Sequence, residues 1–213
     1  MIKWLEDAVF YEVYPQSFRD SNGDGIGDIP GITEKLEYIQ ELGCNALWIN
    51  PCFTSPFYDA GYDVEDYYSV APRYGTNEDL KKLFEAAHQR GMHVLLDLVP
   101  GHTAVTHPWF QESMKAEKNE YTDRYVWTDS LYKRMEDVKG IVSVLRGISP
   151  RPASCGVNCF STQPALNYGF ANITDAGWQQ PTDAPGPMAT REELKNIMRF
   201  WLTLGCDGFR VDM

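Results

Sequence analysis

The sequence predicts an α/β fold in which strands and helices alternate along a parallel sheet. Four short runs rich in apolar and β-branched residues are the expected strands, at residues 9–14, 46–49, 93–99 and 208–211. Between them lie three stretches whose apolar residues recur at helical spacing, at residues 32–42, 77–90 and 190–204. Consecutive strand–helix–strand units join through right-handed crossovers, so we expect the strands to share one parallel sheet.

Capping signals set the expected ends of the three helices. Each stretch is followed by a glycine, the residue that most readily adopts the left-handed backbone that ends a helix: Gly43, Gly91 and Gly205. Asn77 can cap the second helix, because its side-chain oxygen can accept a backbone N–H of the first turn. Thr190 and Glu193 have the spacing of a capping box and predict that the third helix begins there.

A long insertion interrupts this alternation. Residues 103–189 are rich in Pro, Gly, Asn and Ser, and contain only a turn or two of possible helix near residues 109–118. Loops of that length are usually functional or form a small domain of their own. The chain therefore divides into a first part of the sheet, the insertion, and a return to the sheet through one helix and one strand: residues 1–102, 103–189 and 190–213.

The composition argues against several classes of partner. The net charge of −11 over 213 residues disfavours binding to nucleic acid or to an anionic membrane surface. No apolar run approaches the roughly 18 residues of a membrane span, and no signal peptide is visible. The cysteines are scattered, so we expect reduced thiols in a cytoplasmic protein and no zinc site. Whether Cys155 and Cys159 form a disulfide stays open.

The last expected strand carries an arginine and an aspartate two residues apart. Side chains alternate across a strand, so Arg210 and Asp212 point to one face and Val211 to the other. A guanidinium beside a carboxylate favours its ionised form, and an ionised aspartate at the end of a strand suits the nucleophile of a glycosidase. A structural ion pair explains an isolated Arg-x-Asp more simply, so the interpretation depends on the motifs that accompany it.

The segment from Asp20 to Asp28 predicts a calcium loop. Oxygen ligands occur at alternate positions around a tight turn at Gly25: the side chains of Asp20, Asn22, Asp24 and Asp28, and the carbonyl of Ile26. The twelfth position is Gly31 instead of the glutamate of a helix–loop–helix calcium sensor, so a structural Ca²⁺ site is expected. The alternative, a solvated acidic turn, explains one Asp-Gly well but four such spaced ligands poorly.

Polar motifs also follow the second and third strands. Asp97 lies near the end of the third strand and His102 follows it, where polar side chains of parallel barrels build active sites. After the second strand, Tyr62 could stack on a sugar ring and Asp63 could accept hydrogen bonds from its hydroxyls. A lone histidine is more often structural, and we interpret three others in that way: His88, His93 and His107.

Taken in order, these motifs resemble the α-amylase family of glycoside hydrolases and transglycosylases, in particular its oligo-1,6-glucosidase and neopullulanase-like branches. The resemblance covers essentially the whole chain and rests on Tyr11-x-x-Tyr14-Pro15, Phe18-x-Asp20, Gly61-Tyr62-Asp63, Asp97 with His102, Gln163-Pro-Ala-Leu-Asn167 and Gly208-x-Arg210-x-Asp212. It implies the N-terminal half of a (β/α)8 TIM barrel, in which residues 103–189 are the domain B that follows the third strand.

The resemblance implies a role for each matching residue. Asp212 corresponds to the catalytic nucleophile and Arg210 to its ion-pair partner. Among the substrate-binding residues, His102 and Asp63 correspond to ligands of the sugar in the cleaved subsite. Tyr62 corresponds to its stacking platform, and Asp97 to the structural aspartate of the strand end. The calcium loop corresponds to that of the oligo-1,6-glucosidase branch. The expected enzyme is a retaining hydrolase of α-glucosidic bonds in α-glucans or oligosaccharides.

Three positions depart from the family pattern. Gly101 replaces an asparagine that binds a different calcium ion in the α-amylases themselves, so no second calcium site is expected. Ala165 replaces the usual aspartate of its segment, and Met213 follows the expected nucleophile where Val, Ala or Thr is usual. Both positions report linkage preference in this family, so α-1,4 against α-1,6 selectivity stays open.

The family's general acid, a glutamate after the fifth strand, has no counterpart in these 213 residues. Retaining hydrolysis needs two carboxyl groups about 5 Å apart, so we expect an N-terminal fragment of a longer enzyme, with the C-terminal half as its partner. A half barrel of four strands exposes an open sheet edge. Residues 1–213 alone are therefore expected to be inactive and to associate.

Other functions remain alternatives. An α-glucan transglycosylase or a trehalose-forming isomerase would carry the same motifs, and its products would distinguish it. A non-catalytic glycosidase-like protein is a different class; such relatives carry a membrane anchor and lack catalytic residues, whereas this sequence has Arg210 and Asp212. A plain calcium-binding module does not explain the motifs beyond residue 60.

Overall fold

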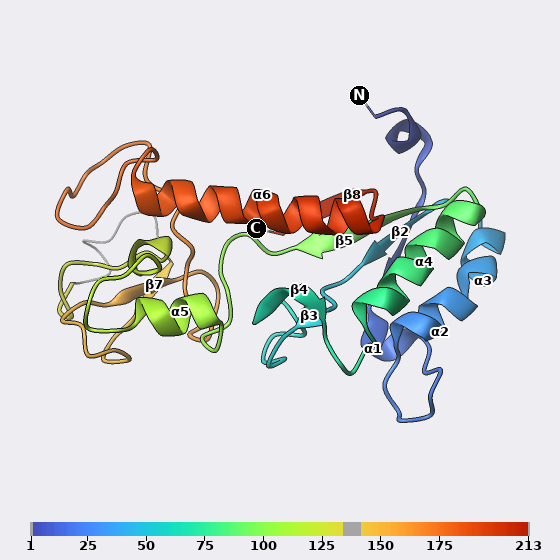
Figure 1. Ribbon diagram of the computed structural model, residues 1–213, viewed down its shortest axis with the longest axis horizontal. Helices are drawn as coiled ribbons and strands as arrows, with labels where there is room; N and C mark the ends of the chain where they lie inside the picture. Colours follow the sequence, from blue (N-terminus) through green and yellow to red (C-terminus); the bar gives the residue numbers. More distant parts are fainter. Residues whose placement is uncertain (1, 134–141, 213) are drawn as a thin grey trace. The chain divides into compact units, whose positions relative to one another are not determined.

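The computed structural model describes residues 2–133 and 142–212 (Figure 1). The chain folds into two compact units. The first contains Met1–Thr54, Asp66–Leu98 and Met198–Asp212, and the second contains Ser55–Glu65 and Val99–Ile197. Each unit has its own β-structure and its own buried apolar residues.

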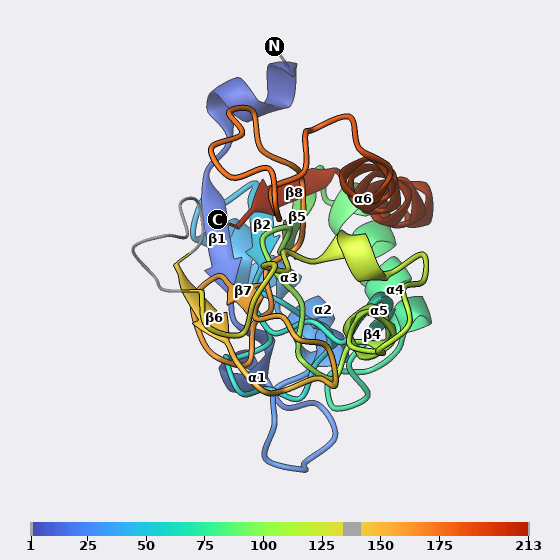
Figure 2. The same ribbon diagram turned by 90° about the vertical axis from the view of Figure 1, so that its left-hand side faces the viewer.

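Four parallel strands form the sheet of the first unit, in the order β1 (Phe10–Val13), β2 (Ala46–Ile49), β5 (His93–Leu98) and β8 (Gly208–Val211). The four expected strands and their parallel pairing are thereby confirmed. Figure 2 shows the strands side by side, with β1 and β8 at the two edges. The register places Asp97 of β5 opposite Arg210 of β8.

The two faces of this sheet differ because side chains alternate along each strand. One face is apolar and fully buried in the two central strands, through Leu47, Ile49, Val94 and Leu96. Helix α4 (Asn77–Gln89) packs against β5, and Figure 1 shows the helices of the first unit along one side of the sheet. The other face carries polar side chains, which include Asp97 and Arg210.

Two short helices replace the single helix that was expected at residues 32–42. Helix α2 (Ile29–Glu34) begins earlier, and α3 (Leu36–Glu41) follows it after a break at Lys35. Lys35 has φ −105° and ψ 8°, and its N–H donates to the carbonyl of Ile32 at 3.0 Å. This tighter turn interrupts the α-helical hydrogen bonding, which the spacing of the apolar residues did not reveal.

Helix α4 confirms the second expected helix, but the expected cap is wrong. Thr76 is the N-cap, and it forms a capping box with Asp79. The side chain of Asn77 instead bonds to the preceding strand: its Oδ1 accepts the Val70 N–H and its Nδ2 donates to the Tyr68 carbonyl, both at 2.8 Å. Asparagine offers a donor and an acceptor, so it can join this helix to a strand while threonine caps it.

Helix α6 (Pro185–Leu204) begins five residues before the expected start at Thr190. Thr190 is fully buried inside the helix, and its Oγ1 donates to the carbonyl of Gly186 at 3.1 Å. The expected capping box at Thr190 is therefore wrong. Proline is favoured in the first turn of a helix, because N–H groups there have no acceptor within the helix and proline lacks the N–H. The helix begins at Pro185.

The expected glycine ends of the helices are confirmed. Backbone φ is positive at all three positions: 87° at Gly43, 69° at Gly91 and 126° at Gly205. Shorter elements of the first unit that the sequence did not indicate are η1 (Lys3–Asp7), α1 (Pro15–Phe18), β3 (Phe53–Thr54) and β4 (Asp66–Val70). Strands β3 and β4 pair antiparallel.

Trp201 of α6 is a central core residue of the first unit. Its side chain is fully buried and stacks on Phe53, with 5.1 Å between the ring centroids. The indole N–H donates to the carbonyl of Tyr67 at 2.8 Å, so the polar atom of this buried ring is satisfied. These contacts fix the last turns of α6, which lead directly into β8.

A histidine–aspartate cluster lies where β5 and β8 begin, at the end of the sheet opposite to Asp97 and Arg210. His88 Nε2 and His93 Nδ1 bond the two carboxylate oxygens of Asp207, at 2.8 and 3.1 Å. Burial raises the pKa of Asp207, but the bonds to both histidines and to the Val94 N–H outweigh burial and hold the pKa below its ordinary value. The structural interpretation of His88 and His93 fits these contacts.

The second unit contains short elements joined by long loops: α5 (Pro108–Ser113), η2 (Thr122–Arg124), and an antiparallel pair β6 (Ser143–Leu145) and β7 (Cys155–Val157). Helix α5 lies within the helical turns expected near residues 109–118, and His107 caps it by accepting the Trp109 N–H. Phe110 is fully buried and packs against the rings of Tyr125 and Trp127.

The five cysteines are free thiols, including Cys155 and Cys159. Burial raises the pKa of the Cys52 and Cys206 thiols to about 12. In the described ranges, every helix is too short or too polar to cross a membrane.

Candidate active site

The C-terminal ends of β5 and β8 hold a cluster of charged side chains in the first unit. Asp97 of β5 and Arg210 of β8 are directly opposite each other in the parallel register. Asp212 follows β8 immediately, and its backbone N–H donates to the carbonyl of Leu98 at 2.8 Å. The strand ladder therefore continues one step beyond β8 and fixes the backbone of Asp212.

Arg210 joins the two carboxylates through one nitrogen. Its Nη1 donates to Asp97 Oδ1 at 3.0 Å and to Asp212 Oδ1 at 2.6 Å. The second contact confirms the sequence-based prediction that Arg210 and Asp212 share one face of the strand. In the described part of the chain, Asp212 Oδ2 has no hydrogen-bond partner, so one oxygen of this carboxylate is held and the other is left for a ligand.

Burial differs among the three residues. The side chain of Asp97 is completely buried, whereas those of Arg210 and Asp212 are 36% and 20% exposed. Burial lowers the pKa of Arg210, but the hydrogen bonds and charges of Asp97 and Asp212 outweigh it and raise the pKa above its ordinary value. Arg210 is therefore a permanent cation on the solvent-exposed side of the cluster.

Trp48 of β2 completes the cluster, and the sequence analysis missed it. Its indole N–H donates to Asp97 Oδ2 at 3.0 Å, and its ring lies beneath the Arg210 guanidinium at 4.8 Å from Cζ to the ring centroid. Asp97 thus has a partner on each carboxylate oxygen. The signal available in the sequence was a tryptophan near the end of the second expected strand, which neighbours the strand that carries Asp97.

Tyr62 and Asp63 belong to a loop of the second unit that hydrogen bonds organise. Asp63 is fully buried, and its carboxylate accepts the Ser55 hydroxyl at 3.0 Å and the N–H groups of Tyr58 and Asp59 at 2.9 and 3.1 Å. Two non-glycine residues of this loop have positive φ, Phe57 at 60° and Ala60 at 51°. Such conformations persist where surrounding bonds hold them, and the Asp63 carboxylate supplies those bonds.

His102 joins the same loop to a distant segment. The ring is buried, its Nε2 donates to the Tyr62 carbonyl at 3.0 Å, and its Nδ1 lies 3.0 Å from Asn158 Nδ2. A carbonyl only accepts, so Nε2 carries a proton and Nδ1 accepts from the asparagine amide, which is the arrangement of a neutral imidazole. Sequence reasoning did not identify Asn158, which is 56 residues away along the chain.

The segment that contains Ala165 lies beside His102. Ala165 forms an antiparallel bridge with His102, and the N–H of Leu166 donates to the carbonyl of Gly101 at 3.0 Å. Gln163 Nε2 donates to Asp59 Oδ2 at 2.6 Å. The second unit therefore brings together the motifs around Tyr62, His102 and Gln163, and the first unit separately brings together Asp97, Arg210 and Asp212. Met213 lies outside the described residues.

Side chains of the expected calcium loop accept hydrogen bonds from the backbone of the same loop. Asp20 accepts the N–H groups of Gly25 and Gly23 at 2.8 and 2.6 Å, and these bonds, Gly25 first, lower the pKa of Asp20. Asp24 and Asn22 each accept the N–H two residues ahead. These pre-oriented oxygen side chains suit a hard cation in donor type.

Asp28, the last side-chain ligand expected in the loop, also caps a helix. One oxygen accepts the Gly31 N–H of α2 at 2.7 Å, and the other accepts the Ser21 hydroxyl at 2.9 Å. Across the described residues, no three His, Cys, Asp or Glu side chains are gathered in a way that could hold a metal ion. The donor types fit Ca²⁺, because each carboxylate oxygen keeps a second lone pair and the predicted set also uses Asn22 and the Ile26 carbonyl.

A parallel βα sheet with charged side chains at the C-terminal strand ends is the arrangement found in α/β barrel enzymes, whose active sites lie at those ends. The family profile described as alpha amylase, catalytic domain, matches residues 12–213. The chain therefore belongs to the alpha-amylase catalytic-domain family, and its parallel sheet is part of a TIM barrel.

Individual relatives agree with the family. An oligo-1,6-glucosidase of Bacillus sp. (strain F5) is 38% identical over 213 residues, which is 100% of this chain and 39% of the relative. A trehalose synthase/amylase TreS of Mycolicibacterium smegmatis is 43% identical over 98% of this chain and 33% of the relative. The crystal structure of trehalulose synthase MutB from Pseudomonas mesoacidophila MX-45 matches with a TM-score of 0.83 and 38% identity, over 98% of this chain and 35% of that chain. The chain spans between 33% and 39% of the length of these relatives.

Proposed function

We propose that the whole protein cleaves or transfers α-glucosidic bonds of oligosaccharides or α-glucans, with Asp212 as the nucleophile of a retaining mechanism. The observation that carries this proposal is the 2.6 Å bond from Arg210 to Asp212 Oδ1 at the end of a barrel strand. The names of the relatives, which include glucosidases and synthases of trehalose and trehalulose, support the class of bond.

The geometry suits attack by the free oxygen of Asp212. Arg210 holds Oδ1, and the backbone bond to Leu98 fixes the position of the residue. Oδ2 is then oriented for attack on an anomeric carbon, and the carboxylate later leaves when water hydrolyses the covalent glycosyl-enzyme.

Retaining hydrolysis requires a second carboxyl group about 5 Å from the nucleophile, to protonate the leaving oxygen. Asp97 is unsuited to this role, because it is completely buried and both of its oxygens are hydrogen-bonded to Trp48 and Arg210. We place the proton donor in the remainder of the protein, since the relatives are more than twice as long as this chain. Without that donor, residues 1–213 alone would lack hydrolytic activity.

Tyr62, Asp63 and His102 are proposed contacts with the substrate. Tyr62 is half-buried and offers an aromatic ring. Both Asp63 and His102 are buried. Asp63 is hydrogen-bonded within its own loop, and His102 is hydrogen-bonded to Tyr62 and Asn158. A sugar hydroxyl that binds to either side chain would replace one of these hydrogen bonds.

Transglycosylation or isomerisation is the second candidate, and the synthases among the relatives favour it. Product analysis of the whole protein with maltose, isomaltose and sucrose separates the two reactions. Hydrolysis releases free glucose in proportion to the bonds cleaved, whereas an isomerase converts the disaccharide into another one with little free glucose. If none of the three sugars is converted, the proposal of an α-glucosidic enzyme is wrong.

The free thiols at Cys44, which is partly exposed, and Cys159, which is exposed, support a reducing compartment. We therefore place the protein in the cytoplasm. Fractionation of the native host, with detection of the protein in the soluble cell extract or in the medium, tests this location.

The Asp20 loop is proposed to bind a structural Ca²⁺ ion through Asp20, Asn22, Asp24, Asp28 and the Ile26 carbonyl. An ion bound only by the folded state stabilises it, by roughly 2.7 kcal/mol when its concentration is a hundredfold above the dissociation constant. We expect EDTA to lower the melting temperature and added Ca²⁺ to restore it.

Asp24→Asn is the matched variant for this test. The amide oxygen can still accept the Ile26 N–H, so the loop keeps its turn while one charged ligand is lost. The variant should melt like the EDTA-treated protein and should respond weakly to Ca²⁺. If EDTA leaves the melting curve unchanged and elemental analysis finds no metal, the site is refuted.

A further inference from the structure

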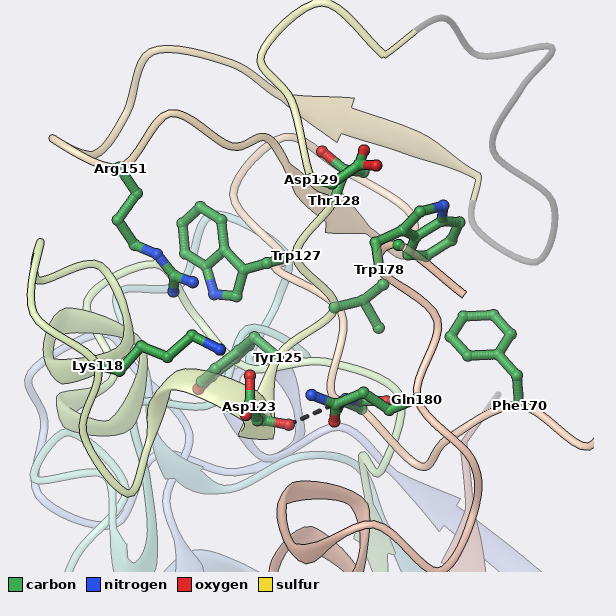
Figure 3. Close-up of a pocket in the computed structure, with 13 residues that line it drawn as sticks. Lys118, Asp123, Tyr125, Trp127, Thr128, Asp129, Arg151, Phe170, Trp178 and Gln180 are labelled. Carbon is green, nitrogen blue, oxygen red and sulfur yellow. Dashed lines mark hydrogen bonds between the residues drawn. The ribbon is translucent and has the colours of Figure 1, made fainter. Parts of the chain in front are cut away.

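A pocket in the second unit shares no lining residue with the clusters around Asp97 and His102. Its volume is about 230 Å³, and its walls come from the loops around η2, β7 and residues 167–180. Figure 3 shows the labelled side chains that surround it. Drug-sized ligands occupy pockets of roughly 300–1,000 Å³, so this pocket suits a smaller molecule, about the size of a single sugar.

Two cations line one side of the pocket. Figure 3 draws the charged ends of Lys118 and Arg151 on the same side. Lys118 is exposed, and no hydrogen bond or ion pair links it to another of the described residues. Arg151 stacks on Trp127 at 4.6 Å, and its Nη1 donates to the Ser113 carbonyl at 2.9 Å. The guanidinium is thereby held in place, with its remaining N–H groups available.

Two carboxylates, Asp123 and Asp129, also line the pocket. Asp129 pairs with Lys133 at 3.0 Å, a residue that does not line the pocket. Asp123 is the remaining carboxylate, and its charge acts on Arg151. Burial lowers the pKa of Arg151, and Asp123 only partly opposes this effect. Lys133 also pairs with Asp175, so the charges around the pocket balance in number. What favours an anion is that Lys118 and Arg151 lie together on one side of the pocket.

The rest of the wall offers groups that recognise a sugar ring. Trp178 and Phe170 pack edge to face at 5.3 Å and give one side an apolar surface. Gln180 accepts from Asn167 Nδ2 at 3.0 Å through its Oε1, which leaves its own amide N–H groups without a partner among the described residues. An aromatic surface with a nearby amide and carboxylate suits a ring that carries hydroxyl groups.

We propose that this pocket binds a monosaccharide with an anionic group, such as a sugar phosphate. Lys118 and Arg151 contact the anionic group, because charge-assisted bonds to phosphate or carboxylate are the strongest that these side chains form. Asp123 and Gln180 bond hydroxyls, and Trp178 contacts the ring. The site includes none of the proposed catalytic residues, and it offers the protein a means of sensing a charged sugar.

Isothermal titration calorimetry of the whole protein tests the proposal with four probes: glucose 6-phosphate, glucuronate, glucose and inorganic phosphate. We expect at least one charged sugar to bind more tightly than both glucose and phosphate, and the two charged sugars distinguish phosphate from carboxylate. Lys118→Glu should weaken that binding by at least about tenfold. Its melting curve and its activity on a neutral glucoside should stay unchanged, because Lys118 is exposed and lies outside the catalytic cluster.

Lys115→Glu is the matched control. Lys115 is also exposed and lies three residues away, but it pairs with Glu112 and does not line the pocket. This variant should bind the charged sugar like the wild type. The proposal is overturned if neither charged sugar binds, if inorganic phosphate binds as tightly as both, or if Lys118→Glu and Lys115→Glu bind equally well.

Discussion

Replacement of Asp212 by asparagine should reduce kcat of the whole protein by several orders of magnitude and leave its fold intact. An amide cannot attack an anomeric carbon or leave as a carboxylate. Its oxygen can still accept the Arg210 bond that Oδ1 accepts at 2.6 Å, and the backbone bond to Leu98 is unaffected. Substrate binding should therefore change much less than turnover. Steady-state kinetics on a glucoside with a chromogenic leaving group, together with a melting curve, measures both effects.

Asp207→Asn is the control for this substitution. Asp207 lies just before the same strand, at its opposite end, where it bonds His88 and His93. The N-terminal ends of barrel strands contribute to stability and the C-terminal ends to catalysis. This variant should melt at a lower temperature and keep a kcat within about threefold of the wild type, a difference below 1 kcal/mol in the barrier. If Asp212→Asn keeps activity within tenfold of the wild type, Asp212 is not the nucleophile.

Removal of Asp97 should have the largest effect on stability. Asp97→Ala removes the buried carboxylate that accepts both the Trp48 N–H and the Arg210 guanidinium. Removing one member of a buried ion pair costs about 3–5 kcal/mol, and the lower value is expected because Arg210 keeps its bond to Asp212. Urea denaturation gives the free energy of unfolding. Activity should fall as well, since Arg210 loses the partner that positions it.

Two conservative variants separate the contributions to this loss. Asp97→Asn keeps the side-chain volume and one acceptor but cannot satisfy both donors, so its stability should lie between those of the wild type and Asp97→Ala. Trp48→Phe keeps a ring beneath Arg210 but removes the N–H, and it should cost about 1 kcal/mol. The cluster does not stabilise the strand ends as described if the free energy of unfolding of Asp97→Ala is within about 0.5 kcal/mol of the wild-type value. This cutoff is about half the contribution of an ordinary hydrogen bond.

The strands could be predicted from the sequence because burial and β-propensity act locally. All four runs contain apolar residues that face the helices, such as Leu47 and Val94, and glycines close the helices between them. The pairing of Arg210 with Asp212 also follows from alternation within one strand. These features depend on neighbours two to four residues away, and such neighbours are visible in a sequence.

Helix starts were harder to predict because several residues compete for the same role. Thr76 and Asn77 both carry side-chain acceptors, and the choice of Thr76 as the cap depends on the bonds that Asn77 makes to Val70 and Tyr68. Thr190 has the spacing of a capping box but lies inside α6. Contacts with the preceding strand decided the first case, whereas in the second the helix already begins at Pro185 and Thr190 bonds back to Gly186 within it.

The surroundings of the site residues could not be predicted because they come from distant segments. Trp48 meets Asp97 across 49 residues, and Asn158 meets His102 across 56. The sequence indicated Asp63 as a sugar ligand without revealing that three donors within its own loop already occupy its carboxylate. Such contacts depend on how the second unit folds, and no local pattern encodes that fold.

Covalent trapping is the most direct test of the central claim that Asp212 is the nucleophile. A fluorinated glucosyl fluoride forms a glycosyl-enzyme that is hydrolysed slowly, and digestion followed by tandem mass spectrometry locates the modified residue. We predict one glucosyl adduct per protein, on the carboxylate of Asp212, and none in Asp212→Asn. An adduct on another carboxylate, or time-dependent inactivation that persists in Asp212→Asn, would contradict the account.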